Sequence, residues 1–387
     1  MRLFKNLTII SAMFICMLVS SRVNAGILWE KELVPDANTN STPFASCLNK
    51  NGDGIFVMTV ECPKGSLPLL GGNCVLWEIG ADGSAIRTLL KDGNGAKIRT
   101  NTETIYGVIG LDTSNNLLTL GVLSKQKGEK GQKIGVISKG GKISPCNSIN
   151  SHSIKKMMPL QDNTFILIGQ RDSNGLYAQI DKQGGIIQEE IFDMGQGEVF
   201  TDIDKPKNDN TSLIIAGISC DLSQPYPKNF ILIYDNNKKI ISEDYFIGKF
   251  PPLLFPKICI LDNSNIVAVY TKAGADPNKT LLTARCYTNK LKLLWEKEIL
   301  STDEIVTFDI ISNNSGFIAA AALNNLELYS FSDNGTKTEH IKYNDNSPGI
   351  PGFNLMRVND KIIVVFEEGI TPVDRKWNFK AKVISLD

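Results

Sequence analysis

Near the start of the chain stands the stretch Ile27-Leu28-Trp29-Glu30-Lys31-Glu32-Leu33, which reappears almost unchanged as Leu293-Leu294-Trp295-Glu296-Lys297-Glu298-Ile299. Only the first and last positions differ, and each exchanges isoleucine and leucine. A match of this quality indicates two copies of one structural element. The chain is therefore expected to contain internal repeats, which should be sought before any other feature.

The repeat consists of a turn rich in Asp, Asn and Gly followed by a short apolar strand. These turns begin at Ala81, Lys139, Asp181, Asp235, Thr288 and Asp333. Such residues supply the positive φ angles that a tight hairpin needs. A second recurring hairpin stands upstream, at Asp162, Asp262, Ser312 and Asn359. Two hairpins in each repeat predict units of four antiparallel strands, a to d from the axis outward.

The spacing of the repeats predicts a closed ring of blades. Equivalent d-strand positions are separated by intervals between 44 and 57 residues, at Arg87, Ser144, Gln188, Ser242, Trp295 and Glu339. A period of roughly 50 residues is typical of propeller blades. The last repeat, from about residue 350 to 387, lacks a fourth strand, which residues 26–34 would supply. We therefore predict an all-β, seven-bladed β-propeller of four-stranded antiparallel blades, closed by the N-terminal strand of the mature chain.

The turn followed by Gly, two apolar residues and Trp or a polar residue resembles the repeats of bacterial propeller proteins of the quinoprotein-like or WD40-like type. The resemblance covers nearly all of the mature chain and implies the propeller fold. Quinone-cofactor dehydrogenases similar to this group carry a Trp-docking consensus in most blades. Here only Trp29, Trp77 and Trp295 occupy c or d strands, and the Thr-Gly pair of that consensus is missing. No cofactor is predicted.

The first 25 residues are typical of a signal peptide. Arg2 and Lys5 precede an apolar stretch, and Val23-Asn24-Ala25 is a small-residue cleavage site. The apolar stretch is short for a bilayer span, which needs about 20 residues. We expect an exported protein, periplasmic or extracellular, in which 26–387 form a single propeller domain without a membrane span.

Charge and cysteine content restrict the possible partners and metals. The 41 basic residues balance the 41 acidic ones, which argues against nucleic acid as a partner. The cysteines lack the spacing and neighbouring histidines of a zinc site, and no metal is predicted. Cys62 and Cys74 flank a short loop between strands b and c, and we treat them as a candidate disulfide. Cys259 and Cys286 fall on strands a and c of one blade, and we interpret them as buried thiols.

Two further motifs have weak matches to known sites. Asn49-Lys50-Asn51-Gly52-Asp53-Gly54 resembles the first half of a calcium loop, but Glu61 is out of register for the last ligand. His152 and His340 are the only histidines, and neither belongs to a nucleophile motif. We interpret the first motif as a hairpin turn and leave the catalytic residues unassigned.

The b–c loops within blades and the d–a loops between blades share one face of a propeller, and the blades differ most there. Loops on a rigid scaffold commonly carry binding. Seven apolar residues in three such segments form the predicted binding patch: Phe250, Leu253, Leu254, Phe255, Ile350, Phe353 and Trp377. Exposed apolar patches can mark protein interfaces. The alternative is that these residues plug the top of the central channel. The sequence predicts a scaffold that binds a protein or glycan partner. The alternative is an enzyme with its active site over the channel, either quinone-dependent dehydrogenase-like or hydrolase-like.

Overall fold

The computed structural model describes residues 27–49, 51–66, 72–98, 104–111, 117–122, 132–138, 140–149, 153–194, 197–206, 212–220, 227–235, 239–247, 255–274, 276, 279–303, 307–322, 325–343, 354–370 and 378–386. The predicted signal peptide, 1–25, lies outside these residues. Every element longer than a turn in the described part is a β-strand. No helix there has the length and hydrophobicity that crossing a bilayer requires.

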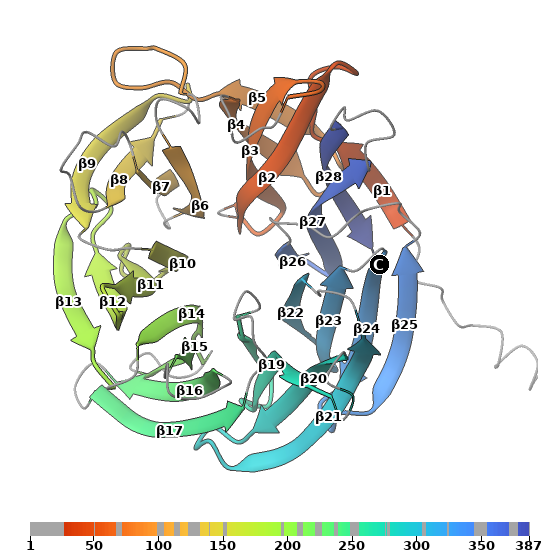
Figure 1. Cartoon of the computed structure of the whole chain (residues 1–387). Helices are drawn as coiled ribbons and strands as arrows, with labels where there is room; N and C mark the ends of the chain where they lie inside the picture. The colour runs from red at the N-terminus through yellow and green to blue at the C-terminus, as the bar shows by residue number, and fades with distance from the viewer. Residues whose placement is uncertain are drawn as a thin grey trace, which may run out of the picture.

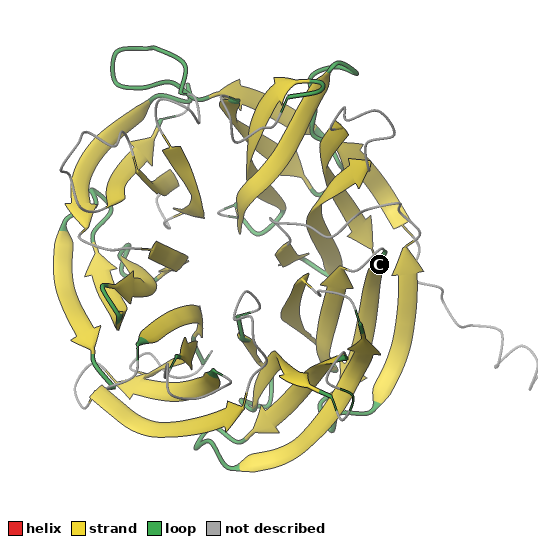
Figure 2. Ribbon diagram, viewed as in Figure 1, coloured by secondary structure: helices red, strands yellow, loops and turns green. Residues whose placement is uncertain are grey.

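Six sheets are continuous blades, each made of four strands that follow one another in the chain (Figures 1 and 2). The first three contain β2 (Thr39–Leu48), β3 (Gly54–Pro63), β4 (Asn73–Gly80) and β5 (Ala85–Leu89); β6 (Thr104–Leu111), β7 (Leu117–Val122), β8 (Gln132–Ile137) and β9 (Ile143–Ile149); β10 (Ser153–Pro159), β11 (Phe165–Arg171), β12 (Asn174–Ile180) and β13 (Ile186–Phe192).

The other three continuous blades complete the middle of the chain. They contain β14 (Glu198–Asp204), β15 (Ser212–Ser219), β16 (Lys228–Asp235) and β17 (Lys239–Ile247); β18 (Lys257–Ile260), β19 (Ile266–Ala273), β20 (Thr280–Tyr287) and β21 (Leu293–Thr302); β22 (Thr307–Asn313), β23 (Gly316–Ala322), β24 (Leu326–Ser332) and β25 (Lys337–Tyr343). In each blade the first strand lies nearest the central opening and the fourth lies at the rim (Figure 1).

The remaining sheet is a composite of the two ends of the chain. It contains β1 (Ile27–Glu32), β26 (Asn354–Val358), β27 (Lys361–Ile370) and β28 (Asn378–Leu386), in the order β1-β28-β27-β26. The predicted count of seven blades is therefore corrected. The described chain forms six continuous four-stranded blades, and the ring is completed by this composite sheet, which we call the closing sheet.

The closing sheet is held by contacts between segments at opposite ends of the sequence. β1 pairs antiparallel with β28, and the Leu33 N–H donates to the Ala381 carbonyl at 2.7 Å. Glu30 accepts from Lys382 at 2.9 Å and from the Tyr343 hydroxyl of β25 at 2.6 Å. These contacts support the predicted role of the N-terminal strand as the partner of the last three strands.

The second strand of a blade is buried on both faces because each face meets a different neighbour. Along β15, Ile214 belongs to the core shared with the β18–β21 blade, whereas Ile215 belongs to the core shared with the β10–β13 blade. Side chains alternate between the two faces of a strand, so neighbouring residues contact opposite blades. Fully burying each such side chain contributes roughly 1.5–3 kcal/mol. A blade alone would lose both interfaces.

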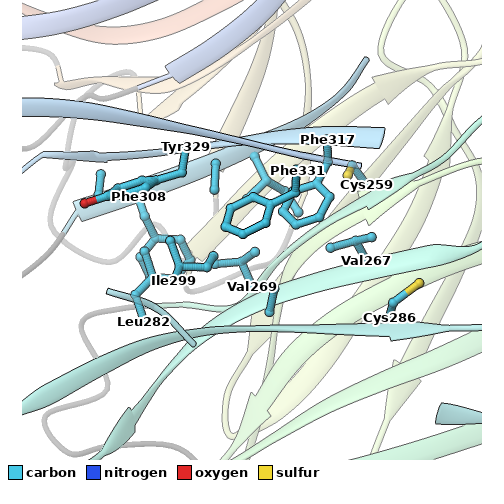
Figure 3. Close-up of a cluster of buried hydrophobic side chains, with 14 of the residues drawn as sticks. Cys259, Val267, Val269, Leu282, Cys286, Ile299, Phe308, Phe317, Tyr329 and Phe331 are labelled. Atoms are coloured by element: carbon cyan, nitrogen blue, oxygen red, sulfur yellow. The ribbon is translucent and has the colours of Figure 1, made fainter. Parts of the chain in front are cut away.

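Aromatic stacking reinforces one of these interfaces, between the β18–β21 and β22–β25 blades (Figure 3). The rings of Phe317 and Phe331 stack with centroids 4.9 Å apart and an interplanar angle of 8°. Trp295 of β21 stacks on Phe317 from the neighbouring blade at 6.1 Å. Cys259 and Cys286 are buried in the same cluster as free thiols.

The two matching tryptophans have the same structural role. The Trp29 indole donates to the Ala81 carbonyl at 2.9 Å, and the Trp295 indole donates to the Asp333 carbonyl at 3.2 Å. Each ring lies on the turn between the third and fourth strands of the next blade. Gly83, with φ of 81°, occupies that turn below Trp29, and a Cβ added to it would come within 3.0 Å of the ring. The sequence repeat thus encodes docking between blades.

We expect Gly83→Ala to destabilise the protein more than Gly52→Ala. Both glycines have positive φ, where a Cβ costs about 1–2 kcal/mol, but nothing lies within 4 Å of a Cβ added to Gly52. Contact with the Trp29 ring should add about 1 kcal/mol for Gly83→Ala, by overpacking. Urea unfolding midpoints measure the difference. Equal midpoints for the two variants would contradict the proposed docking.

The stability of the junction between the closing sheet and the first blade should depend on pH. Glu367 of β27 is buried beside Thr42 of β2, and burial raises its pKa to about 7. Between the ordinary glutamate pKa and that value, the folded chain keeps a proton that the unfolded chain has released. The glutamate therefore makes stability fall as pH rises through this interval.

We expect Glu367→Gln to remove this contribution. Relative to the wild type, the variant should gain about 3 kcal/mol between about pH 4 and about pH 8. Urea unfolding at both pH values measures the gain, with the exposed Glu298→Gln as the matched control. A constant difference between wild type and Glu367→Gln at the two pH values would refute this assignment.

Candidate functional site

The inner strands enclose a cavity of about 470 Å³ in the central opening. Its lining comes from β2, β10, β14, β18, β22 and β26, each of which lies at the end of its sheet's strand order. Six charged side chains face it: Lys155, Lys156, Asp204, Lys257, Asp309 and Arg357. Because the inner strands of successive blades run in the same direction, the residues near their first positions gather at one end of the cavity.

Aspartates on the inner strands connect neighbouring blades. Asp202 of β14 accepts a hydrogen bond from the backbone N–H of Ile258 on β18, at 2.8 Å. Asp309 of β22 accepts in the same way from the backbone N–H of Leu355 on β26, at 2.8 Å. Asp204 repeats the arrangement with the N–H of Ile260 at 2.9 Å. We call these three contacts the aspartate clasps.

Lysines and an amide extend the clasps around the channel. Lys156 of β10 donates to Asp202, which joins a further blade to the same carboxylate. Lys257 lies 3.9 Å from Asp309. Asn354 of β26 donates to the Ser46 hydroxyl of β2 at 2.8 Å. The contacts therefore run without interruption from β10 through β14, β18, β22 and β26 to β2.

Burial and ionic pairing act in opposite directions on the pKa values of these groups. Burial raises the pKa of Asp204 and of Asp309 above the ordinary aspartate value, although nearby lysines and backbone N–H groups oppose the shift. For Lys156 burial acts to lower the pKa, but the charge of Asp202 and the hydrogen bond to it outweigh burial and raise the pKa. Lys156 and Asp202 are therefore held as an ion pair.

The cavity also contains two thiols, which are weak nucleophiles. Burial raises the pKa of Cys47 to about 12 and places that of Cys259 well above its ordinary value. Because the thiolate is the reactive form of cysteine, neither thiol is activated. Among the described residues of the cavity, the lysines and aspartates form fixed charged contacts, and the two thiols are unreactive.

Of the predicted binding patch, only Phe255 belongs to the described residues. It is half-buried at the end of the cavity where the inner strands begin, and the Lys155 ammonium lies 4.6 Å from the centroid of its ring. The carbonyl of Pro256, the next residue, accepts a hydrogen bond from the Thr201 hydroxyl of β14 at 3.1 Å. The other six members of the patch lie outside the described residues: Phe250, Leu253, Leu254, Ile350, Phe353 and Trp377.

The predicted disulfide between Cys62 and Cys74 is not formed, and both cysteines are free thiols. Cys74 of β4 pairs with Val60 of β3, two residues before Cys62. This offset displaces the two cysteines by about 7 Å along the strands, which is too far for a bridge. The Cys62 thiol instead donates to the Ser66 carbonyl at 3.3 Å.

The other sequence motifs have structural partners where the structure describes them. Asn49 and Asp53 bond to each other at 2.7 Å in the β2–β3 hairpin, as expected of a turn. Within the described residues, no group of three His, Cys, Asp or Glu side chains could hold a metal. His340 stacks on Tyr329 and lies 3.1 Å from Glu327, whereas His152 lies outside the described residues.

Sequence reasoning missed the aspartate clasps. The sequence does contain a repeated Asp-Ile pair, Asp202-Ile203 and Asp309-Ile310, in inner strands two repeats apart. An acidic residue at the same place in separate repeats indicates a shared contact. The sequence does not show that this contact is a backbone N–H of the next blade.

No family model and no curated protein matches the chain by sequence. Among solved structures it is similar to the Dos1 propeller, at 12% identity and a TM-score of 0.55, over 94% of this chain and 95% of that chain. BamB from Moraxella catarrhalis matches at 10% identity and a TM-score of 0.50, over 94% and 99%. Drosophila plexin A in complex with semaphorin 1b matches at 8% identity and a TM-score of 0.54, over 94% and 87%. At these identities the likeness shows a β-propeller fold alone.

We expect Asp309→Ala to destabilise the ring by about 1–3 kcal/mol, because it leaves the buried Leu355 N–H without an acceptor. Asp309→Asn keeps an acceptor oxygen at that place and should cost less. The surface substitution Asp360→Ala, at a side chain 93% exposed, is the control, with an expected change within about 0.5 kcal/mol. Urea unfolding measures all three. If the alanine and asparagine variants at position 309 are equally stable, the clasp does not hold the blades.

Proposed function

We propose that this chain is an exported propeller that binds a protein or glycan partner through the loops at the end where its inner strands begin. The main support for this proposal is that the aspartate clasps join neighbouring blades. Asp202, Asp204 and Asp309 accept backbone N–H groups of neighbouring blades, so these channel carboxylates are engaged in holding a rigid ring. A rigid ring that presents variable loops is suited to recognition.

The loop that contains Phe255 provides the first candidate contact. Phe255 comes between the rim of the cavity and the variable loop 248–254, and its backbone is anchored next to it through Pro256. A half-buried aromatic ring on an anchored segment is the kind of residue that contributes strongly to interfaces. Plexin A, one of the similar structures, was solved with a protein bound to it, although a shared fold does not determine function.

The alternative function is an enzyme acting over the channel, quinone-dependent dehydrogenase-like or hydrolase-like. The cavity itself favours this alternative, because about 470 Å³ with lysines and aspartates in its lining is within the range of small-molecule sites. The raised thiol pKa values of Cys47 and Cys259 argue against a cysteine nucleophile there.

Site-specific photo-crosslinking in the organism that makes this protein distinguishes the two functions. A photoreactive amino acid replaces Phe255 in one strain and Ile86, which is 64% exposed on the rim strand β5, in another. We expect one discrete adduct from position 255 and none from position 86. The purified partner should then bind Phe255→Ser about tenfold more weakly than wild type, and Ile86→Ser with unchanged affinity.

Two results would overturn the proposed function. The first is an identical set of adducts from both positions, which would indicate contact without a specific face. The second is the absence of an adduct from position 255 together with turnover of a hydrolase or dehydrogenase substrate. Melting curves of Phe255→Ser and Ile86→Ser verify that both variants are folded.

A further inference from the structure

Two aspartates at the central cavity have their carboxylates bonded by donors of the protein itself. Asp202 accepts from Lys156 and from the Ile258 N–H. Asp204 accepts from the N–H groups of Lys205 and Ile260. These carboxylates therefore have hydrogen-bond donors supplied by the protein itself, and they need no cation from solution.

The lysines at the same end of the cavity have poorer partners. Lys155 of β10 places its ammonium over the Phe255 ring, a contact that supplies no hydrogen-bond acceptor. Lys257 of β18 forms an ion pair with Asp309 at 3.9 Å, which is too long for a hydrogen bond. Because an ammonium has three donors, both lysines retain donors for a further acceptor.

The environment of Lys155 supports the same conclusion independently. Burial lowers the pKa of its ammonium. A partly buried cation with no anionic partner among the described residues carries a desolvation cost. An anion that enters the cavity would remove part of that cost.

We infer that the cavity end lined by Lys155 and Lys257 binds a small organic anion carrying carboxylate or phosphate groups. Both lysines line one cavity of about 470 Å³, which is large enough for such a molecule. They lie on β10 and β18, on either side of the inner strand β14, and near the first positions of their strands. A ligand between them would meet ammonium groups from two blades. This inference is independent of the proposed partner of the loop face.

Arg357 of β26 also belongs to the positively charged lining of the cavity. Its guanidinium donates to the Asn359 carbonyl at 3.0 Å and to the Asn314 side chain at 2.6 Å. Asp360 lies 3.6 Å from it. Arg357 is therefore held by its own surroundings, and the test concentrates on the two lysines.

Isothermal titration of the mature chain, 26–387, tests the inference. The probes are citrate, glycerol phosphate and uncharged glycerol, in low-salt buffer. We expect saturable binding of at least one anion and none of glycerol. The preferred anion distinguishes a carboxylate ligand from a phosphate ligand. Its affinity should fall as sodium chloride is raised, because salt screens the attraction.

Matched lysine variants locate the site. Lys155→Gln and Lys257→Gln should each weaken binding of the preferred anion by about tenfold. Lys182→Gln, in the exposed turn between β12 and β13, should leave the affinity unchanged. Lys155→Arg keeps the charge and should restore most of the affinity. A saturating anion should also raise the melting temperature of the wild type more than that of Lys155→Gln.

Three results would overturn the inference. The first is that neither anion binds the wild type. The second is that glycerol binds as well as the anions. The third is that Lys182→Gln weakens binding as much as Lys155→Gln does. The last result would indicate diffuse attraction to surface lysines. Melting curves without ligand confirm that the variants are folded, so lost affinity is not confused with lost structure.

Discussion

Each blade needs a neighbour on both sides, and the rest of the structure depends on this requirement. The second strand of a blade buries alternate side chains against two different blades, as Ile214 and Ile215 do on β15. A linear row of such blades would leave two large apolar faces in water, and burying apolar surface is favourable by roughly 25 cal/mol for each Å². Pairing of β1 with β28 removes those faces by joining the ends of the chain in one sheet. The ring is thus closed by the same interaction that builds each blade.

The centre of the ring is held differently, because the inner strands there line a cavity with charged and polar side chains. Polar contacts hold this region. Asp202 and Asp309 each bond to a backbone N–H of the next blade, and Lys156 connects a third blade to Asp202. A carboxylate that accepts several donors tolerates partial burial, whereas an unpaired one does not. This arrangement leaves Lys155 and Lys257 with the less satisfied charges, so the proposed anion site is a consequence of how the blades are joined.

Of the predicted binding patch, a single residue lies in the described part of the chain. Phe255 was predicted from its apolar loop, and the structure places it against Lys155 at the end of the channel. Lys155, Lys257 and Asp309 were not predicted, because a charged residue in a strand is ordinarily interpreted as solvent-exposed. The disulfide prediction for Cys62 and Cys74 was wrong because proximity in a hairpin does not determine register, and an offset of two residues separates them.

Local sequence alone determined the strands, the turns and the partnership of the chain ends. Turn residues such as Gly83 and alternating apolar residues act over a few positions, and the repeat of Trp29 as Trp295 is visible without coordinates. The tertiary structure decided how the blades are counted, since six are continuous and the closing sheet is composite. It also decided which charges meet in the channel. The physical reason is that these contacts join residues about one blade or more apart in the chain, as with Asp309 and Leu355, and no local pattern specifies them.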